Sequence, residues 1–317
     1  MAGSSAETII GIDLGGTKVY GVRTDADGGV AAESKSKTPV QGGPLGVVDA
    51  IAEVVRELAE GATGGRLRVG VGAPGVIDTD RGVVRAAPNL PGWSEPFGLG
   101  EALAEALDGA SVVIDNDVNV GLLAEARVGA AQGEDDVLGV FVGTGVGGAV
   151  MLGGKLRRGP HGMTGEIGHI VVHPGGRTCG CGGRGHLEAY AGRAGMERRA
   201  RELESTGRPT VLTELAKAKR MTSSVWDKAI AQGDDVAIHL IDDAVEALGY
   251  AIAGVVTVLD LPLVVVGGGL ADRLGPRFVG RVEQAVRSQL FAGTRLRVVP
   301  AELGDRAGAL GAALLVT

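Results

Sequence analysis

GIDLGGTK at residues 11–18 decides the fold of this chain, together with a second stretch of similar pattern, GVFVGTG at residues 139–145. Each stretch is an apolar run that predicts a buried strand, followed by a glycine-rich turn with a hydroxyl residue. A second strand is predicted after each turn. Since similar orders of strands and helices follow both stretches, we predict an α/β protein of two similar halves. Two such halves facing each other would create a cleft with a glycine-rich turn from each at its floor.

The apolar spacing along the chain predicts the individual elements. Predicted strands cover residues 8–13, 18–23, 67–72, 111–114, 137–142, 149–152, 263–266 and 296–300, with a further strand after the turn at 25–29. Predicted helices cover residues 45–60, 99–107, 118–128, 193–205, 212–219, 224–231, 236–259, 276–290 and 305–315. We expect a small N-terminal α/β domain of residues 1–118 plus 303–317, which includes the final helix. Residues 119–302 form a larger α/β domain with helical insertions.

The composition excludes several classes of function. The net charge of -7 over 317 residues disfavours an electrostatic surface for nucleic acid, and the basic run at residues 155–158 is interpreted as a solvated turn. The start MAGSSAET lacks the apolar segment of a signal peptide. The longest apolar stretch, residues 251–270, is interrupted by Asp260, Pro262 and glycines, which disfavours a membrane span. We therefore expect a cytoplasmic protein that binds neither nucleic acid nor membrane.

Residues 165–188, GEIGHIVVHPGGRTCGCGGRGHLE, hold both cysteines of the chain, Cys179 and Cys181. His169 lies ten residues before the first cysteine, and His186 lies five residues after the second. Two thiolates and two imidazoles in glycine-rich turns suit a closed tetrahedral Zn2+ site. His173 is an alternative ligand to either histidine, and a pair of ordinary free thiols is the alternative to a metal site. A disulfide between cysteines two residues apart is disfavoured because it would be strained.

The turn at the end of the first predicted strand has the residues of a phosphate-binding loop. Gly15 and Gly16 allow the backbone to approach an anion, and Thr17 and Lys18 add a hydroxyl and a cation. Asp13, at the end of the strand, is suited to hold hydrated Mg2+. A β-hairpin without a ligand is the alternative interpretation.

Two further glycine-rich turns are candidates for nucleotide binding. GTGVGG at residues 143–148 matches the dinucleotide pattern G-x-G-x-x-G, but that pattern requires a helix directly afterwards. AVMLGG at residues 149–154 predicts a hairpin strand instead, so a phosphate loop is favoured over a dinucleotide fold. GGG at residues 267–269 follows a buried strand and precedes a helical segment, where a nucleotide could approach the backbone.

Polar side chains lie between a strand and a helix in IDNDVN, residues 114–119. Asn116 or Asp117 is a good helix N-cap. A carboxylate at a strand end that faces a cleft can also accept the proton of a substrate hydroxyl. PNLPGW at residues 88–93 is a rigid turn with one amide side chain.

Together these motifs resemble the ROK family, named for repressors, open reading frames and kinases, and within it the bacterial glucokinases. The resemblance covers nearly the whole chain, in the family's order: GIDLGGTK, GAPGVID, NLPGW, IDNDVN, VGTGVGG, the segment from GEIGH to GHLE, and VVVGGGL. It implies the two-domain actin-like ATPase fold, with ribonuclease H-like domains and an interdomain active-site cleft. It also implies ATP-dependent phosphoryl transfer to a hexose, most of all glucose, by a homodimer or homotetramer.

The resemblance assigns roles to individual residues. Asp117 would be the catalytic base for the sugar 6-hydroxyl. The sugar would be bound by Gly75, Asn89, Asn116, Asp117, Glu166, His169 and Glu188. MgATP would be bound by Asp13, Gly15, Gly16, Thr17 and Lys18 in the first loop, Thr144, Gly145 and Gly147 in the second, and Gly268 and Gly269 near the adenosine. A structural Zn2+ would be held by His169, Cys179, Cys181 and His186.

One position departs from the family pattern. The family segment usually reads C-x-C-G-x-x-G-C-x-E, whereas His186 stands here in place of the third cysteine. Since histidine is a competent zinc ligand, we expect a Cys2His2 site with weaker affinity.

Three other functions remain open at the level of sequence. The first is a kinase for mannose, N-acetylmannosamine, fructose or allose. The second is a sugar-responsive repressor, which is disfavoured because only about eight residues precede the first strand. The third is a non-enzymatic sugar sensor. Polyphosphate is a possible donor, although the ordinary GGTK turn favours ATP.

Overall fold

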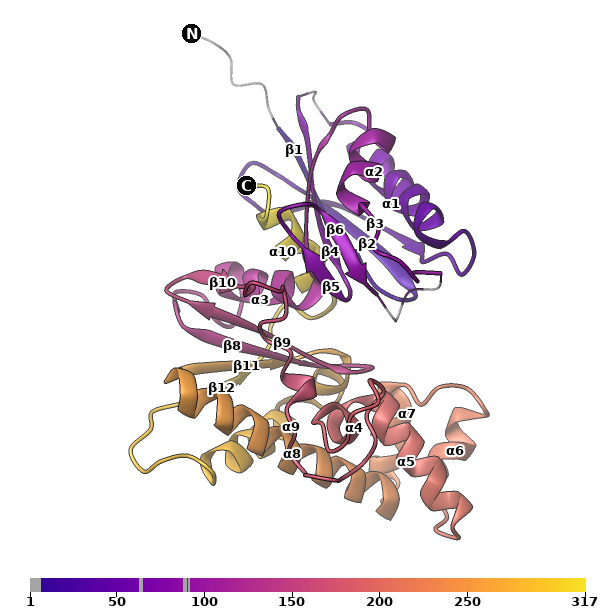
Figure 1. Ribbon diagram of the computed structural model, residues 1–317, viewed down its shortest axis with the longest axis vertical. Coiled ribbons are helices and arrows are strands. Elements are labelled where there is room, and N and C mark those ends of the chain that lie inside the picture. The colour runs from indigo at the N-terminus through magenta and orange to yellow at the C-terminus, as the bar shows by residue number, and fades with distance from the viewer. Residues whose placement is uncertain (1–6, 63–64, 88–89, 91) are drawn as a thin grey trace. The chain divides into compact units, whose positions relative to one another are not determined.

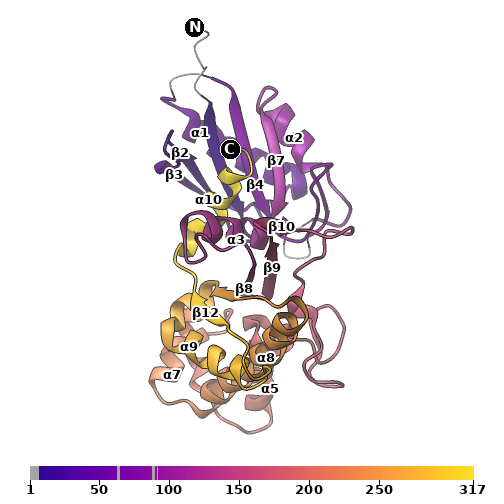
Figure 2. The ribbon, with the colours of Figure 1, turned by 90° about the vertical axis from the view of Figure 1, so that its left-hand side faces the viewer.

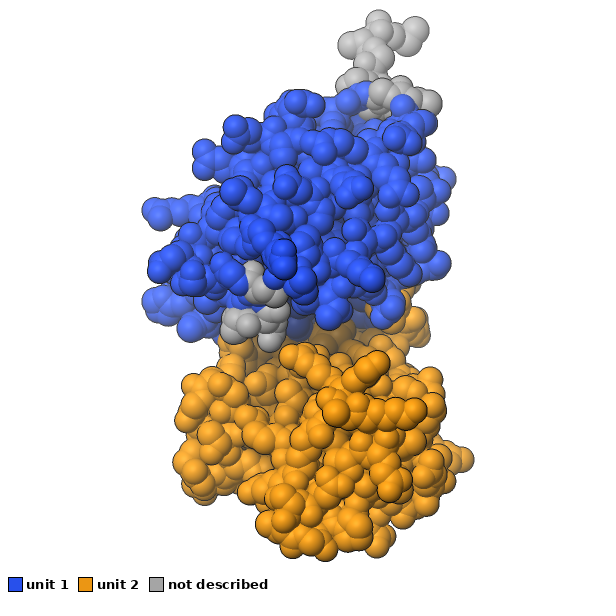
Figure 3. Space-filling view, turned by 90° about the vertical axis from the view of Figure 1, so that its right-hand side faces the viewer, with its two compact units in different colours: residues 1–128, 158–164, 305–317 blue, residues 129–157, 165–304 orange. Residues whose placement is uncertain are grey.

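The computed structural model describes residues 7–62, 65–87, 90 and 92–317. The chain forms two compact units, which are coloured separately in Figure 3. Unit 1 comprises Met1–Val128, Arg158–Thr164 and Asp305–Thr317, and unit 2 comprises Gly129–Arg157 and Gly165–Gly304. The first division lies at residue 128 rather than 118 because helix α3 (Asp117–Val128) packs against α10 (Ala307–Leu314).

Unit 1 is built on a five-stranded sheet with helices on both faces (Figure 1). Its strands are β1 (Thr8–Leu14), β2 (Lys18–Thr24), β3 (Val30–Lys37), β4 (Leu67–Ala73) and β7 (Ser111–Asn116), in the order β3-β2-β1-β4-β7. β1, β2 and β3 pair antiparallel, and β1, β4 and β7 pair parallel. Helices α1 (Gly43–Ala59) and α2 (Leu99–Ala106) cover one face, and α3 and α10 cover the other. A small hairpin of β5 (Val76–Asp78) and β6 (Val83–Ala86) lies beside this sheet.

Small residues let the last helix of the chain lie directly on the first sheet. A Cβ added at Gly11 would lie 2.0 Å from the carbonyl oxygen of Ala309, and one at Gly70 would lie 1.7 Å from that of Ala312. No side chain larger than hydrogen fits at either position. The glycines of β1 and β4 therefore explain why α10, at the far end of the sequence, belongs to unit 1.

Unit 2 repeats the strand arrangement of unit 1. Its strands are β8 (Val137–Val142), β9 (Val146–Leu152), β10 (Lys155–Arg157), β11 (Leu263–Gly267) and β12 (Arg297–Pro300), in the order β10-β9-β8-β11-β12. The pairing is again antiparallel along β8, β9 and β10 and parallel along β8, β11 and β12. The predicted repetition of one topology is thus confirmed. Each unit has a ribonuclease H-like sheet, and the fold is the two-domain actin-like ATPase fold.

Helices pack against the sheet of unit 2 (Figure 2). The two longest are α8 (Asp235–Leu259) and α9 (Gly269–Arg287), and α9 contacts β8, β11 and β12. The shorter helices are α4 (Glu188–Ala191), α5 (Arg193–Ser205), α6 (Val211–Ala216) and α7 (Ser223–Ala231). Two 3-10 turns are η1 (Ile167–His169) and η2 (Gly304–Arg306), the second where the chain passes from unit 2 to unit 1. Within the described residues, no helix is both long enough and apolar enough to span a membrane.

The interpretation of the basic run 155–158 as a solvated turn is wrong. Residues 155–157 form β10, whose backbone pairs with β9 at the sheet edge, and Arg158 pairs with a buried carboxylate of unit 1. An edge strand tolerates charged side chains because one side of it faces water. The run therefore looked like a turn although its backbone belongs to the sheet.

Candidate functional site

The first glycine-rich turn is a tight hairpin between β1 and β2. The amide of Gly15 donates to the carbonyl of Lys18 at 2.8 Å, which closes the turn. Thr38 supports it from outside, because its hydroxyl donates to the carbonyl of Gly15 at 2.6 Å. Gly16 and Thr17 stay exposed at the tip. The turn is therefore fixed in shape while its tip remains accessible to an anion.

Asp13 lies at the end of β1, packed against the start of α10. A Cβ added at Gly308 would lie 2.7 Å from the Asp13 carboxyl carbon, so this glycine leaves the room that the carboxylate occupies. Burial raises the pKa of Asp13 to about 6, which Lys18 opposes and Asp305 reinforces. Lys18 also forms an ion pair with Asp305 at 3.3 Å. Oxygen ligands of this kind suit a divalent cation such as Mg2+, which would favour the charged form of Asp13.

We expect Asp13→Asn to stabilise the metal-free protein at pH 8. The folded-state pKa of about 6 lies above the ordinary aspartate value of 3.8, so the folded chain binds this proton more tightly than the unfolded chain. The carboxylate therefore disfavours folding above pH 6, and this penalty fades as the pH falls toward 4. The variant should gain about 3 kcal/mol in free energy of unfolding at pH 8 and less at pH 5. Urea unfolding without Mg2+ at both pH values measures this, and an equal gain at both would contradict the assignment.

The end of β7 brings two predicted sugar-binding residues together. The side-chain amide of Asn116 donates to the carbonyl of Gly75 at 3.0 Å, and its oxygen accepts from the amide of Val118 at 2.9 Å. Asp117 is the first residue of α3, and its Oδ1 accepts from the same amide at 2.9 Å. Gly75 has a φ of 97°, which favours glycine. The N-cap prediction is thus confirmed, and capping fixes the polar side chains at this strand end. Asn89 lies outside the described residues.

A buried carboxylate anchors this strand end. Asp115 is only 1% exposed, and its Oδ2 accepts two hydrogen bonds from Arg158, at 2.8 and 2.5 Å. Its Oδ1 accepts from the amide of Asn116 at 2.7 Å and from the side chain of Asn119 at 2.9 Å. Four donors therefore fix the residue that directly precedes Asn116 and Asp117.

Removal of the Arg158 side chain should leave this carboxylate buried and uncompensated. We expect Arg158→Ala to lose about 3 kcal/mol in free energy of unfolding, since breaking one partner of a buried ion pair is strongly destabilising. Arg157→Ala removes a neighbouring, exposed guanidinium and is the matched control. In the Asp115→Asn background, Arg158→Ala should lose clearly less, because the charge is gone. Equal losses in both backgrounds, measured by urea unfolding, would argue against the network.

The second glycine-rich turn, in unit 2, is held by two neighbouring segments. The amides of Arg193 and Ala194, at the start of α5, donate to the carbonyls of Gly143 and Thr144 at 3.1 and 3.0 Å. Glu188 approaches from α4, and its Oε2 accepts from the amide of Val146 at 3.2 Å.

The structure explains glycine at two of the four predicted nucleotide-binding glycines in unit 2, Gly145 and Gly268. A Cβ at Gly145 would lie 2.1 Å from Oε2 of Glu188, so only glycine allows this carboxylate to approach the turn. Gly147 lies in β9, opposite Phe141. Gly268 has a φ of 87°, and a Cβ there would lie 2.7 Å from the backbone nitrogen of Val142. Gly269 begins α9. The β11–α9 turn therefore lies against the end of β8, directly before the second glycine-rich turn.

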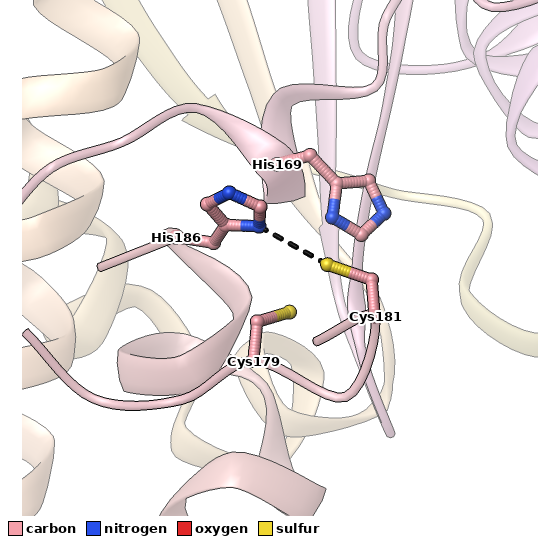
Figure 4. A group of neighbouring side chains, drawn as sticks. All are labelled: His169, Cys179, Cys181 and His186. Carbon is pink, nitrogen blue, oxygen red and sulfur yellow. Dashed lines mark hydrogen bonds between the residues drawn. The ribbon is translucent and has the colours of Figure 1, made fainter. Parts of the chain in front are cut away.

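The four predicted metal ligands converge in unit 2 (Figure 4). His169 comes from η1, and Cys179, Cys181 and His186 come from the loop after it. Their ligand atoms all lie within 4.8 Å of one another, and Sγ of Cys181 lies 3.2 Å from Nδ1 of His186. A tetrahedral site has metal–ligand bonds of about 2.0–2.3 Å, so the group needs only a modest contraction to hold Zn2+. The chemistry and spacing of the donors thus fit the metal.

The local backbone makes room for the histidine that replaces a cysteine. A Cβ at Gly183 would lie 2.3 Å from the Cε1 atom of His186, so the imidazole lies where a side chain at position 183 would be. Burial raises the pKa of the Cys179 thiol to about 11, and a bound cation would favour its thiolate. Sγ of Cys179 lies 3.7 Å from Oε1 of Glu188, which connects the metal ligands to the second glycine-rich turn.

The alternative metal ligand, His173, lies outside the cluster in the described structure. Its ring stacks on Tyr190 with a centroid distance of 4.7 Å.

The predicted sugar ligand Glu166 lies beside the metal cluster, with its Oε2 3.8 Å from Nε2 of His169. Both side chains remain solvent-accessible, at 45% and 40% exposed, so they are available to a polar ligand.

Several residues at these turns carried no signal in the sequence. Thr38 supports the first turn, Asp305 pairs with Lys18, and Arg158 fixes Asp115. Nη2 of Arg193 donates to the hydroxyl of Thr144 at 3.2 Å. In each of these pairs the two residues lie far apart in the sequence. The sequence points to one member alone, Asp115, because it directly precedes Asn116.

Comparison with known proteins identifies the family. The ROK family domain matches residues 9–317. The glucokinase of Thermotoga maritima is 36% identical over 313 residues, covering 97% of this chain and 96% of that protein. An N-acetylmannosamine kinase of Escherichia coli is 33% identical over 310 residues, covering 97% and 98%. The structure resembles that of a ROK family glucokinase from Streptomyces griseus in complex with glucose and AMPPNP, with 34% identity, a TM-score of 0.83 and 98% and 99% of the two chains covered. The chain belongs to the ROK family.

Proposed function

We propose that this protein is an ATP-dependent glucokinase that forms glucose 6-phosphate and ADP. The observation that carries the proposal is the strand end of β7, where Asp117 stands beside Asn116 on a backbone fixed by Asp115 and Gly75. A carboxylate held in this way can accept the proton of a sugar hydroxyl. The similarity to glucokinases over nearly the full length supports glucose as the hydroxyl donor.

In the proposed reaction, the sugar O6 attacks the γ-phosphorus of ATP in line with the leaving group. The bond from the γ-phosphorus to its bridging oxygen breaks, ADP leaves, and the O6 proton passes to Asp117. The loops at residues 15–18 and 143–147 would hold the phosphates through backbone amides, with Gly268 and Gly269 near the adenosine. Asp13 would help to hold Mg2+, which neutralises charge on the phosphates. Asn116, Glu166, His169 and Glu188 would hold the sugar hydroxyls.

We propose a structural Zn2+ on His169, Cys179, Cys181 and His186. The metal would rigidify the segment from Glu166, directly before η1, to Glu188, the first residue of α4. Glu188 and His169 would thereby be fixed relative to each other. The Cys2His2 set carries one negative charge fewer than the family's usual three cysteines and one histidine. Mg2+, a cytoplasmic location and a homodimer or homotetramer stay predictions of the family resemblance.

A kinase for N-acetylmannosamine is the second candidate, because a relative named for that activity is 33% identical over nearly the full length. The deciding experiment measures ADP release with MgATP and a panel of glucose, mannose, fructose, allose and N-acetylmannosamine. We expect the highest kcat/KM for glucose. A higher value for N-acetylmannosamine would favour the second candidate, and no turnover with any sugar would refute both.

A further inference from the structure

The segment Arg158–Thr164 belongs to unit 1, although the residues on both sides of it in the sequence belong to unit 2. The chain leaves the edge strand β10 at Arg157 and re-enters unit 2 at Gly165. The next residue is Glu166, which is one of the proposed ligands of the sugar hydroxyls. The contacts that fix this segment in unit 1 therefore also determine how the chain approaches Glu166.

Arg158 attaches the start of the segment to the strand end that carries the proposed base. Its Nε and Nη2 donate to Oδ2 of Asp115 at 2.8 and 2.5 Å. Asp115 is buried and directly precedes Asn116 and Asp117. Two charge-assisted donors on one buried carboxylate oxygen fix the guanidinium in direction as well as in distance. The segment therefore starts from a fixed point at the end of β7.

The segment closes on itself, so its last residue is fixed together with its first. The amide of Thr164 donates to the carbonyl of Arg158 at 3.1 Å. The Thr164 hydroxyl occupies the space beside Gly159, where an added Cβ would lie 2.5 Å from Oγ1. A Cβ at Gly162 would lie 2.6 Å from the carbonyl oxygen of Ile77, so the middle of the segment packs on β5. The segment is thus a closed loop that is held at its start and in its middle.

Only one residue separates this loop from Glu166. Gly165 has a φ of 93°, and a Cβ there would lie 2.4 Å from the carbonyl oxygen of Gly148 in β9. Glycine has the most backbone freedom to lose, so Gly165 keeps this conformation only while the residue before it is fixed. Release of the loop would restore that freedom, and Glu166 would then sample several positions.

We propose that Arg158 is a positioning residue for the sugar. Its guanidinium orders the strand end that carries Asn116 and Asp117, and as the anchor of the loop it also fixes the approach of the chain to Glu166. The proposal rests on the proposed function, because it takes these three residues as groups that contact the sugar. Groups that are held in place before the ligand arrives lose less entropy on binding, so the Arg158 side chain should lower the KM for glucose.

The test removes Arg158 where its buried partner is already neutral. Asp115→Asn supplies this background, in which Arg158→Ala costs clearly less stability than in the unmodified protein. We expect the KM for glucose to rise about tenfold from the single to the double variant, because misplaced substrate-positioning groups can cost about 10²-fold. The KM for ATP should stay within twofold. Arg157→Ala removes a neighbouring exposed guanidinium and is the matched control, which should leave both KM values unchanged.

Two further measurements test the loop itself. Gly159→Ala leaves the Arg158 side chain and Asp115 in place, but its methyl group would clash with Thr164 at a φ of 72°, so the KM for glucose should rise here as well. Hydrogen exchange at the amide of Thr164, which donates to the carbonyl of Arg158, does not depend on activity. It should be about tenfold faster in the double variant than in Asp115→Asn, because the loop opens locally.

Three results would overturn the proposal. They are a KM for glucose in the double variant within twofold of that in Asp115→Asn, an unchanged exchange rate at Thr164, and an equal rise in the KM for ATP, which would indicate a general loss of structure. Each is compatible with glucokinase activity. Absence of glucose phosphorylation by the unmodified protein would instead refute the proposed function, and hydrogen exchange would still decide whether Arg158 holds the loop.

Discussion

Asp117→Ala should lower kcat for glucose phosphorylation by about 10²–10⁴-fold and leave glucose affinity within a few-fold, because general-base catalysis contributes on this scale. The variant removes the acceptor of the O6 proton but leaves Asn116 and its hydrogen bond to Gly75 in place. It should also fold, because the amide of Val118, which donates to Asp117, is within hydrogen-bond distance of Oδ1 of Asn116 as well. The start of α3 therefore keeps an acceptor.

Two further variants separate the charge of Asp117 from its position. Asp117→Asn keeps the shape and loses the base, so we expect a loss in kcat close to that of alanine. Asp117→Glu keeps the carboxylate but moves it, and should retain more activity than either. Steady-state kinetics give kcat, and quenching of tryptophan fluorescence by glucose gives the Kd. A kcat within threefold of the unmodified protein in Asp117→Asn would refute the assignment of the base.

Strands and helices with a clear apolar period were predicted well from the sequence. The predictions for residues 137–142 and 193–205 coincide with β8 and α5. By contrast, β9 begins at Val146 rather than at residue 149, because its first residues are glycine-rich and were assigned to the turn. The short elements β5, β10, η1 and α4 were not predicted. Elements of three or four residues have no measurable period, and tertiary contacts decide whether they form.

The candidate site was predictable where its chemistry is local in sequence. The four metal ligands lie within eighteen residues, so their spacing alone indicated a cluster, which the structure bears out. The Asp115–Arg158 and Lys18–Asp305 pairs join residues 43 and 287 positions apart, and no pattern in the sequence connects them. The raised pKa of Asp13 likewise depends on α10, at the other end of the chain. Motifs identify the reacting groups, whereas their supporting partners require the fold.

Cys181→Ser should abolish stoichiometric zinc binding and raise the KM for glucose about tenfold or more. The purified protein should contain one Zn2+ per chain, because two thiolates and two imidazoles complete a tetrahedral set without water. Loss of one thiolate leaves only three protein ligands for the metal. The loop that positions His169 and Glu188 then loses its cross-link. In structural sites the free energy of metal binding stabilises the fold directly, so Tm should fall as well. Elemental analysis, thermal unfolding and glucose kinetics in excess Mg2+ measure the three effects.

Substitutions at the histidines test whether His186 is the fourth ligand. His186→Cys supplies the thiolate usual in the family and should retain zinc with higher affinity, because thiolate is charged and binds Zn2+ strongly. His186→Ala should lose the metal. His173→Ala is the matched control, since that ring packs on Tyr190 and lies outside the cluster, so its zinc content should not change. Gly183→Ala should also weaken zinc binding, because its methyl group would displace the imidazole. Full activity in a metal-free protein would contradict the structural role of zinc, and zinc loss in His173→Ala would instead assign the fourth ligand to His173.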